Sequence, residues 1–276
     1  MTETAIATRL ALLIDSDNVS GKHARAIIDE LATYGTLTVR RAYGDWSSNQ
    51  LAQWRDRLHA NAITPVQQFA NTKGKNSTDS ALIIDAMDLL YSGNLDGFVI
   101  VSSDSDFTRL ATRLRESGKV VYGIGAKKTP QAFTEACDRF IYLENLGAEE
   151  PPETAETAET AETAKKEPEA APKEVEDATN PRLQSRVHKA LHATSGDDGW
   201  STMSAIGQQL QKSDPTFDPR TYGFSKLSEL MTHLPYVDIR WDGGRPGAGR
   251  VWVKPKGKGP SPAKKAAKAP AKKSAK

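Results

Sequence analysis

Two stretches of this chain are apolar at every position and then stop at acidic residues. The first is LALLIDSDN at residues 10–18, and the second is GFVIVSSDSDF at residues 97–107. A strand without polar alternation must be covered on both faces, as in a parallel sheet with helices above and below it. Such a core is expected to deliver Asp15 and Asp104 to the ends of two buried strands.

The residues around these two runs alternate between short apolar segments and amphipathic segments. We predict helices near residues 20–34, 48–60, 78–92, 106–117 and 130–137. The predicted strands lie near residues 9–15, 36–44, 62–69, 97–102 and 119–124, with a short last strand at 139–143. This order predicts an α/β fold, a doubly wound parallel sheet sandwich, because each pair of parallel strands is joined through a helix.

Changes in composition divide the chain into two folded segments and two segments of biased composition. Residues 148–180 repeat a Glu-Thr-Ala triplet and lack aromatic residues, which predicts a disordered acidic linker. Residues 255–276 are rich in Lys, Ala and Pro without any acid, which predicts a disordered cationic tail suited to a polyanion such as nucleic acid. The folded segments are then residues 1–147 and 181–254.

The cysteine content and the hydropathy of the chain bear on where it works. A single cysteine, Cys137, excludes an intramolecular disulfide, so nothing points to an oxidising compartment. No apolar run approaches the roughly 20 residues of a membrane helix, and the first residues lack the layout of a signal peptide. These features predict a soluble cytoplasmic protein that does not enter a membrane.

Acidic residues gather at the predicted carboxyl ends of the strands, where sites form in open parallel sheets. Asp15 follows the first strand, Asp104 and Asp106 follow the fourth, and Asp79 lies near the start of a predicted helix. If the two strands are neighbours, these carboxylates repel one another, and a bound Mg²⁺ or Mn²⁺ relieves the repulsion. We therefore predict a metal site made of Asp15, Asp79, Asp104 and Asp106, with Asn18 beside it.

Helix capping is the competing interpretation of the same aspartates. Ser, Asp and Asn are usual N-caps, and Ser103 with Asp106 fits a capping-box pattern. Of the two acids after the fourth strand, we expect Asp104 to be the direct ligand and Asp106 to serve partly as a cap. The weaker candidates for the site are Asp17, Asp85 and Asp88.

Five motifs span the first folded segment in this order: LLIDSDNVS, RRAYGDW, KNSTDSALIIDAMDLLY, DGFVIVSSDSDFTRLATRLRESGKVVYGIG and ACDRFIYLE. Together they closely resemble LabA-like NYN domains, members of the PIN-like nuclease superfamily. The resemblance implies a PIN-like α/β sandwich with a Mg²⁺- or Mn²⁺-dependent ribonuclease site. It maps the acidic residues of that site onto Asp15, Asp79 and Asp104, with Asp106 and Asn18 adjacent.

The chain departs from the commoner text of this family at two places. Ser103 stands where a glycine often precedes the aspartate, and NSTD stands before the predicted helix in place of a Gly- or Val-rich approach. Neither change removes a carboxylate, so the implied site is retained.

Basic residues of the first segment are candidates for guiding RNA to the acidic site. Catalysis there would be an in-line attack on the phosphodiester by metal-activated water, so His23 and His59, which lie in helical patterns, are not needed as bases. Lysine and arginine supply most sequence-independent affinity for nucleic acid. The residues predicted to guide the phosphate backbone are Lys73, Lys75, Arg40 and Arg41.

The second folded segment has helical apolar spacing followed by the strands YVDIRW and RVWVK around a Gly-rich turn. This pattern predicts a small winged-helix-like domain. Residues 218–239, DPRTYGFSKLSELMTHLPYVDI, resemble the LOTUS family, also called OST-HTH, which implies RNA binding or protein interaction rather than chemistry. A winged helix that reads DNA is the rival interpretation. The predicted contact residues are Arg220, Lys226, Arg245 and Arg250.

Three functions remain open from the sequence. The first is a metal-dependent endoribonuclease with an RNA-binding domain, and the second is a non-catalytic RNA-binding or scaffold protein with a structural metal. The third is a haloacid-dehalogenase-like phosphatase with Asp15 as nucleophile and Asp17 as acid or base, although the lysine it needs is absent between Asp85 and Asp104. The choice of RNA or DNA, of one or two metals, and of monomer or homodimer also stays open.

Overall fold

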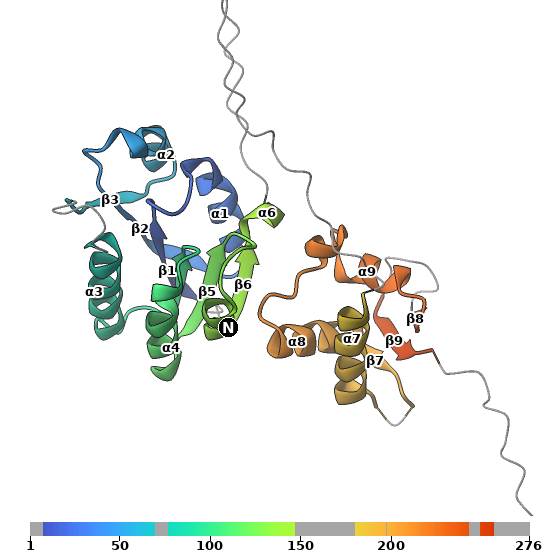
Figure 1. The fold of residues 1–276 in the computed structure, drawn as a ribbon. Coiled ribbons are helices and arrows are strands. Elements are labelled where there is room, and N and C mark those ends of the chain that lie inside the picture. Colours follow the sequence, from blue (N-terminus) through green and yellow to red (C-terminus); the bar gives the residue numbers. More distant parts are fainter. Residues whose placement is uncertain (1–7, 70–76, 147–179, 197, 243–248, 257–276) are drawn as a thin grey trace, which may run out of the picture.

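The computed structural model describes residues 8–69, 77–146, 180–196, 198–242 and 249–256, which fold into two domains (Figure 1). Nearly all of the predicted linker and tail lies outside these residues, as do the predicted RNA contacts Lys73, Lys75 and Arg245. Within the described part of the chain, no helix is long and apolar enough to cross a membrane.

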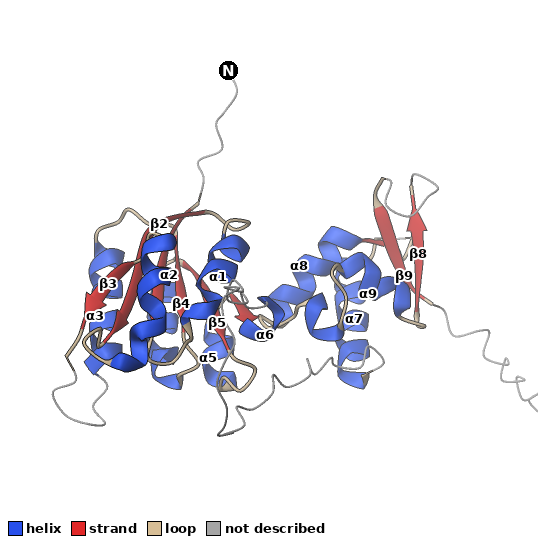
Figure 2. Cartoon of the chain, turned by 90° about the horizontal axis from the view of Figure 1, so that it is seen from above, coloured by secondary structure: helices blue, strands red, loops and turns tan. Residues whose placement is uncertain are grey.

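A six-stranded parallel sheet forms the centre of the first domain. Its strands are β1 (Arg9–Asp15), β2 (Thr36–Gly44), β3 (Thr64–Gln67), β4 (Gly97–Val101), β5 (Val120–Gly125) and β6 (Arg139–Tyr142). They lie in the order β3-β2-β1-β4-β5-β6, with helices on both sides (Figure 2). The predicted doubly wound parallel sheet and its six strands are therefore confirmed.

The helices between these strands lie close to the predicted positions. They are η1 (Gly21–His23), α1 (Ala24–Leu31), η2 (Asn49–Trp54), α2 (Arg55–Ala60), α3 (Ser77–Tyr91), η3 (Ser105–Phe107), α4 (Thr108–Glu116), α5 (Gln131–Ala136) and α6 (Leu143–Leu146). The three 3-10 segments η1, η2 and η3 lead directly into α1, α2 and α4. The chain therefore turns back tightly after β1, β2 and β4 and keeps polar residues close to the strand ends.

Alternate residues of β1 point to opposite layers of the sandwich. Leu10, Leu12 and Ile14 pack with residues of α1, η2 and α2, whereas Ala11 and Leu13 pack with residues of α3, α4 and α5. All five side chains are fully buried, and each buried Leu or Ile stabilises the fold by about 1.5–3 kcal/mol. Burial on two faces is the physical reason why the central strands are apolar throughout.

The sheet reverses its strand order between β1 and β4. The chain moves outward from β1 to β3 and returns through α3 to β4, whose residues pair with β1 from Leu10 with Gly97 to Ile14 with Val101. In open parallel sheets, binding sites form at such a reversal, outside the carboxyl ends of the strands. The register therefore places Asp15 beside the segment that follows Val101.

Helices and a small antiparallel sheet form the second domain. Its elements are α7 (Pro181–Thr194), β7 (Ser201–Thr202), α8 (Met203–Ser213), η4 (Pro219–Tyr222), α9 (Leu227–His233), β8 (Val237–Trp241) and β9 (Val251–Pro255). The sheet has the order β7-β9-β8, and buried side chains from α7, α8, α9 and both longer strands form one core. This succession of elements matches the predicted winged-helix-like layout.

The second domain contacts the first along the edge strand β6. Phe140 N on β6 donates a hydrogen bond to Pro215 O over 2.9 Å. Asn145 Nδ2 on α6 donates to Thr221 Oγ1 over 3.1 Å. Because the unpaired backbone groups of an edge strand are open to pairing with other chains, this contact protects part of the sheet edge.

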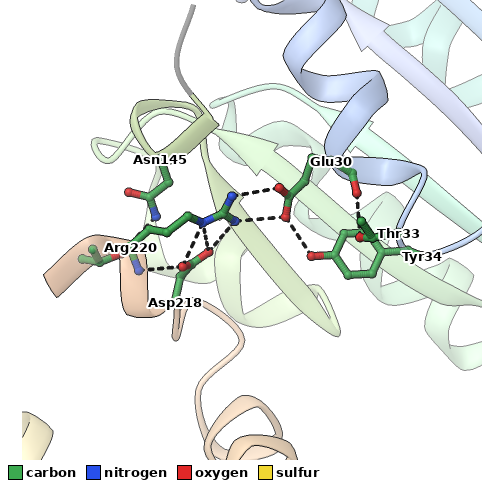
Figure 3. A network of polar contacts seen from close by, with 7 residues as sticks. Glu30, Thr33, Tyr34, Asn145, Asp218 and Arg220 are labelled. Carbon is green, nitrogen blue, oxygen red and sulfur yellow. Dashed lines mark hydrogen bonds and ion pairs between the residues drawn. The ribbon is translucent and has the colours of Figure 1, made fainter. Parts of the chain in front are cut away.

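Arg220 joins the two domains through an ion-pair network (Figure 3). Its Nη1 and Nη2 atoms lie 2.8 and 3.0 Å from the two carboxylate oxygens of Glu30 on α1, and its Nε and Nη2 atoms also contact Asp218. Burial raises the pKa of Glu30, but hydrogen bonds from Arg220 and Tyr34 outweigh burial and hold it below its usual range. Arg220 is a predicted RNA contact, yet each of its three guanidinium nitrogens has a carboxylate partner.

We expect Arg220→Ala to loosen the docking of the two domains, because Glu30 and Asp218 then remain close together without their shared cation. Fluorophores attached at Ala60→Cys and Ser204→Cys, two exposed positions, report the separation of the domains by energy transfer. The native Cys137 is buried and does not compete for the label. Transfer efficiency should fall in Arg220→Ala.

Arg182→Ala, which removes an exposed arginine of α7, serves as the matched control and should leave transfer efficiency unchanged. In a double-mutant cycle on the free energy of unfolding, Arg220→Ala and Glu30→Gln should couple by about 0.5–3 kcal/mol. Additive effects, together with wild-type transfer efficiency in Arg220→Ala, would contradict docking through this pair.

Candidate functional site

Asp15 ends β1 as a buried carboxylate. Asp15 is 4% exposed, and Ser102 Oγ donates a hydrogen bond to its Oδ2 atom over 2.8 Å. Burial raises the pKa of Asp15 to about 6, the Ser102 hydroxyl opposes the rise, and the charges of Asp79 and Asp17 add to it. The acid therefore lies at the site but is anchored inside the protein.

Asp104 directly precedes η3 after β4, and Asp106 lies within η3. Asp104 Oδ1 accepts a hydrogen bond from Asp106 N over 3.0 Å, so Asp104 is the N-cap of η3. Ser103 Oγ accepts from Ala126 N over 2.8 Å. The N-cap of η3 is therefore Asp104, so Ser103 does not fill the N-cap position that the capping-box pattern gives it. The 3-10 turn begins one residue later than the capping box requires, and the capping role passes to Asp104.

Asp79 reaches the same rim from the first turn of α3. Carboxylate oxygens of Asp79, Asp104 and Asp106 all lie within 4.8 Å of one another. Burial is the main cause that raises the pKa of Asp79, followed by the negative charges of Asp104, Asp106 and Asp17. Three of the four predicted carboxylates thus form one cluster, and Asp15 lies behind it.

Asn18 and Asp17 fasten the loop after β1 to its neighbours. Asn18 Oδ1 accepts a hydrogen bond from Ser103 N over 2.9 Å. Asp17 Oδ2 accepts from Thr78 Oγ1, at the start of α3, over 2.9 Å. Asn18 therefore holds the two strand-end loops together, as its predicted place beside the site implies, and Asp17 holds the start of α3.

Ser102 is a site residue that the sequence reasoning overlooks. Its hydroxyl donates to Asp15 and accepts from Asp104 N over 3.1 Å, so it connects the buried acid to the acid at the rim. Ser102 is itself fully buried. The signal in the sequence is the pair of serines that separates β4 from Asp104, because a buried hydroxyl at a strand end requires polar partners.

The carboxylate cluster has the composition of a site for a hard divalent cation. Mg²⁺ and Mn²⁺ prefer carboxylate and water oxygens, and like charges this close are costly unless a cation or protons neutralise them. Asp79, Asp104 and Asp106 supply such oxygens from two different elements, α3 and the loop after β4. The residues therefore fit an ion of this class.

The two predicted basic contacts of the first domain that the structure describes, Arg40 and Arg41, are tied to neighbouring elements. Arg41 forms an ion pair with Asp85 on α3, and the Tyr43 hydroxyl donates to the same carboxylate. Arg40 Nη1 donates to Asn61 O over 3.0 Å. Asp85 thus holds β2 against α3, and the guanidinium of Arg41 is engaged inside the domain.

Two predicted contacts of the second domain are exposed. Lys226 is the N-cap residue of α9, and Arg250 directly precedes β9. Both remain candidates for phosphate contact, whereas Arg220 is committed to the domain interface.

Two sequence models of known domain families match this chain. The NYN domain matches residues 9–144, and the OST-HTH/LOTUS domain matches residues 180–247. Their order and extent agree with the two resemblances in the sequence, and the NYN match covers the whole parallel sheet and the acidic cluster.

Similar proteins include an uncharacterized protein of Methanocaldococcus jannaschii, 31% identical over 123 residues, which are 43% of this chain and 48% of that protein. This chain therefore spans about half the length of the curated relative. A crystal structure of a protein of unknown function from Vibrio parahaemolyticus is 18% identical, covers 51% of this chain and 95% of that chain, and has a TM-score of 0.44.

A solution NMR structure of part of a protein from Chromobacterium violaceum is 27% identical over 31% of this chain and 91% of that chain, with a TM-score of 0.25. These low scores add no weight to the fold assignment, which rests on the strand order and on the two domain matches.

We expect Asp15→Asn to stabilise the metal-free protein at neutral pH. Because burial raises the pKa of Asp15 to about 6, the folded state favours the protonated carboxyl. The stability that the wild type gains from protonating Asp15 is fully present below about pH 4 and is lost as the pH rises through about 6. Urea unfolding in EDTA should show the variant more stable by about 1–3 kcal/mol near pH 8.

The gain in the free energy of unfolding of Asp15→Asn should vanish near pH 4, which is about the pKa of an aspartate in the unfolded state. Asp88→Asn, which neutralises an exposed acid of α3, is the control and should show no such pH-dependent gain. A less stable Asp15→Asn protein at both pH values would mean that the folded state does not disfavour the charge of Asp15.

Proposed function

We propose that this chain, which carries an NYN domain at residues 9–144 and an OST-HTH/LOTUS domain at residues 180–247, is a ribonuclease that depends on Mg²⁺ or Mn²⁺ and binds RNA through its second domain. It hydrolyses RNA phosphodiester bonds at the cluster of Asp79, Asp104 and Asp106. The observation that supports this most is the convergence of three carboxylates at the point where the strand order reverses.

Asp79, Asp104 and Asp106 would hold the cation in this proposal. A bound divalent cation supplies a Lewis acid that lowers the pKa of water and neutralises charge on the phosphate. Asp104 and Asp106 come from the segment after β4 and Asp79 from α3, so a cation bound by all three would join these two parts of the fold. The same negative rim repels RNA until a cation is present.

In this proposal Asp15 and Asn18 hold the loop that carries Asp104 in position and do not bind the cation themselves. Asp15 accepts from the Ser102 hydroxyl, which leaves a lone pair of that hydroxyl facing Asp104 N. Asn18 accepts from Ser103 N and holds the same loop from the other side. Removal of either contact would loosen the backbone of the loop that carries the Asp104 carboxylate, and orientation of metal ligands by such neighbours is worth about 10–100-fold in affinity or activity.

The second domain binds the RNA in this proposal. We assign residues 1–147 to the nuclease domain and 181–254 to the RNA-binding domain, with 148–180 as an acidic linker and 255–276 as a cationic tail. A tether keeps the two domains at high effective concentration, so RNA captured by one domain is presented to the other.

The burial of Asp15 disfavours the phosphatase alternative. A nucleophilic aspartate must reach the phosphorus atom of its substrate, but Asp15 is only 4% exposed, and Ser102 occupies one of its oxygens. Asp17, the corresponding acid or base, is bound to Thr78.

We expect Asp104→Asn and Asp79→Asn to reduce Mn²⁺-dependent cleavage of single-stranded RNA on the order of 100-fold or more, equivalent to about 2.7 kcal/mol of transition-state stabilisation. Each variant weakens the charge that would hold the cation, but neither residue belongs to the RNA-binding domain. RNA affinity in EDTA should therefore stay close to that of the wild type. Cleavage of a labelled oligonucleotide, resolved on a gel, measures the first effect, and fluorescence anisotropy measures the second.

Asp88→Asn is the matched control, because it neutralises an exposed acid of α3 about two and a half turns beyond Asp79. It should cleave like the wild type. If the wild-type protein binds RNA but shows no cleavage that depends on Mn²⁺ or Mg²⁺, the chain is instead a non-catalytic RNA-binding protein.

A further inference from the structure

The outer face of the small sheet in the second domain combines aromatic rings with cations. Val253 of β9 and Val237 of β8 are buried in the domain core, so their neighbours in sequence point outward. Trp252 pairs with Arg240 across the two strands and with Thr202 on β7. We call the outward residues Trp200, Arg240, Trp252 and Lys254 the tryptophan face.

Arg240 lies between the two rings of this face. Its Cζ atom is 4.7 Å from the ring centroid of Trp200 and 5.9 Å from that of Trp252. Lys254 Nζ lies 6.0 Å from the ring centroid of Trp200. Both tryptophans are half-buried, whereas the Arg240 side chain remains exposed. The guanidinium is therefore held over aromatic rings and is still accessible from solvent.

Contacts with neighbouring residues hold these side chains in place. Trp252 Nε1 donates to Asp242 Oδ2 over 2.9 Å, which fixes the orientation of the ring. A Cβ atom on Gly199, which has φ of 76°, would lie 3.2 Å from Lys254 Cε. The positive φ favours glycine at this position, and the missing side chain leaves room for the Lys254 side chain beside Trp200. A face ordered before binding loses less entropy when a ligand arrives.

The charge around the face suits a polyanion. Arg250 and Lys256 flank β9 and are exposed, and the sequence beyond residue 256 adds further lysines and no acid. Asp238, which pairs with Lys254 across the strands, and Asp242, which accepts from Trp252, offset two of the positive charges around the face. The described cations Arg250 and Lys256 thus lie in the sequence on either side of β9, and the sequence that continues from them is basic.

The tryptophan face is separate from the domain interface. The contacts between domains use η4 and the segment before it, at Pro215, Thr221 and Arg220. Figures 1 and 2 both show β8 and β9 on the side of the second domain that is turned away from the first domain. The face therefore stays open while the domains are docked.

We propose that the tryptophan face binds single-stranded RNA by stacking unpaired bases against Arg240 and Trp252. This inference rests on the proposed function for the class of ligand and assigns it a surface. Single-stranded nucleic acids are held by aromatic and guanidinium planes on which successive bases stack, together with cations that follow the backbone. The face supplies both kinds of group on adjacent strands, and stacking of this kind accepts any base.

The test is binding of full-length protein to a short oligouridylate in EDTA, measured by fluorescence anisotropy, so that cleavage plays no part. Arg240→Ala and Trp252→Ala should each weaken binding by about 5- to 100-fold. Arg240→Lys keeps the charge but loses the plane, so it should bind nearly as weakly as Arg240→Ala. Trp252→Phe keeps an aromatic ring and should restore most of the affinity.

Two controls separate stacking from charge. An abasic oligonucleotide of equal length retains the phosphates, so it should bind the wild type more weakly and should be insensitive to Trp252→Ala. Lys226→Ala removes an exposed charge of the same domain outside the tryptophan face and should weaken binding less than Arg240→Lys. Thermal unfolding of each variant checks that the second domain is folded. If Trp252→Ala does not fold, Arg240→Ala still tests the inference, because the Arg240 side chain is exposed and its removal leaves the core intact.

Wild-type affinity for oligouridylate in both Arg240→Ala and Trp252→Ala would overturn the inference. Equal affinity of the wild type for the abasic and oligouridylate strands would overturn it too. Failure of the proposed function can be told apart from failure of this inference. In that case the wild-type protein shows no metal-dependent cleavage, but its RNA binding still depends on Arg240. Failure of the inference alone appears as cleavage that requires Asp104, with binding indifferent to the tryptophan face.

Discussion

The pairing of β1 with β4 places acidic residues from distant parts of the chain at one rim, and the rest of the site depends on this pairing. Apolar burial on both faces of the sheet fixes the register, because a slip by one residue would turn every side chain to the opposite layer. The register in turn fixes the positions of Asp15 and Asp104 at the carboxyl ends of the two strands. The fold therefore uses hydrophobic burial to hold carboxylates closer together than their mutual repulsion favours.

The acids at this rim have unequal surroundings. Asp15 is buried behind Ser102, whereas Asp106 is exposed and Asp104 lies between these extremes as the cap of η3. Hydrogen bonds run from the interior outward, from Asp15 through Ser102 to Asp104. The loop that presents the outer carboxylates is thus held by the inner one. In our account the outer acids meet the cation, and the inner acid keeps them in place.

The strands and the acids at their ends follow from the sequence, because two-sided apolar runs and capping residues are local signals. The pairing of β1 with β4 was only a condition of the predicted site, since strand order depends on contacts between distant segments. The roles of Asp104 and Asp106 were harder to separate, since one turn residue decides which carboxylate accepts the backbone N–H. Arg220 lay beyond local reasoning, because its partner Glu30 is 190 positions away in the chain. The pairing of Arg240 with Trp252 likewise depends on the register of the hairpin formed by β8 and β9, which the local sequence pattern does not fix.

Arg220 serves structure at the contact between the two domains, where it pairs with Glu30 and Asp218. The central claim is that the carboxylate cluster exists to hold a divalent cation. Anomalous diffraction from crystals soaked in Mn²⁺ tests this claim most directly. We predict an anomalous peak about 2.0–2.2 Å from carboxylate oxygens of Asp79, Asp104 and Asp106. A map with no peak at this cluster under saturating Mn²⁺ would contradict the account.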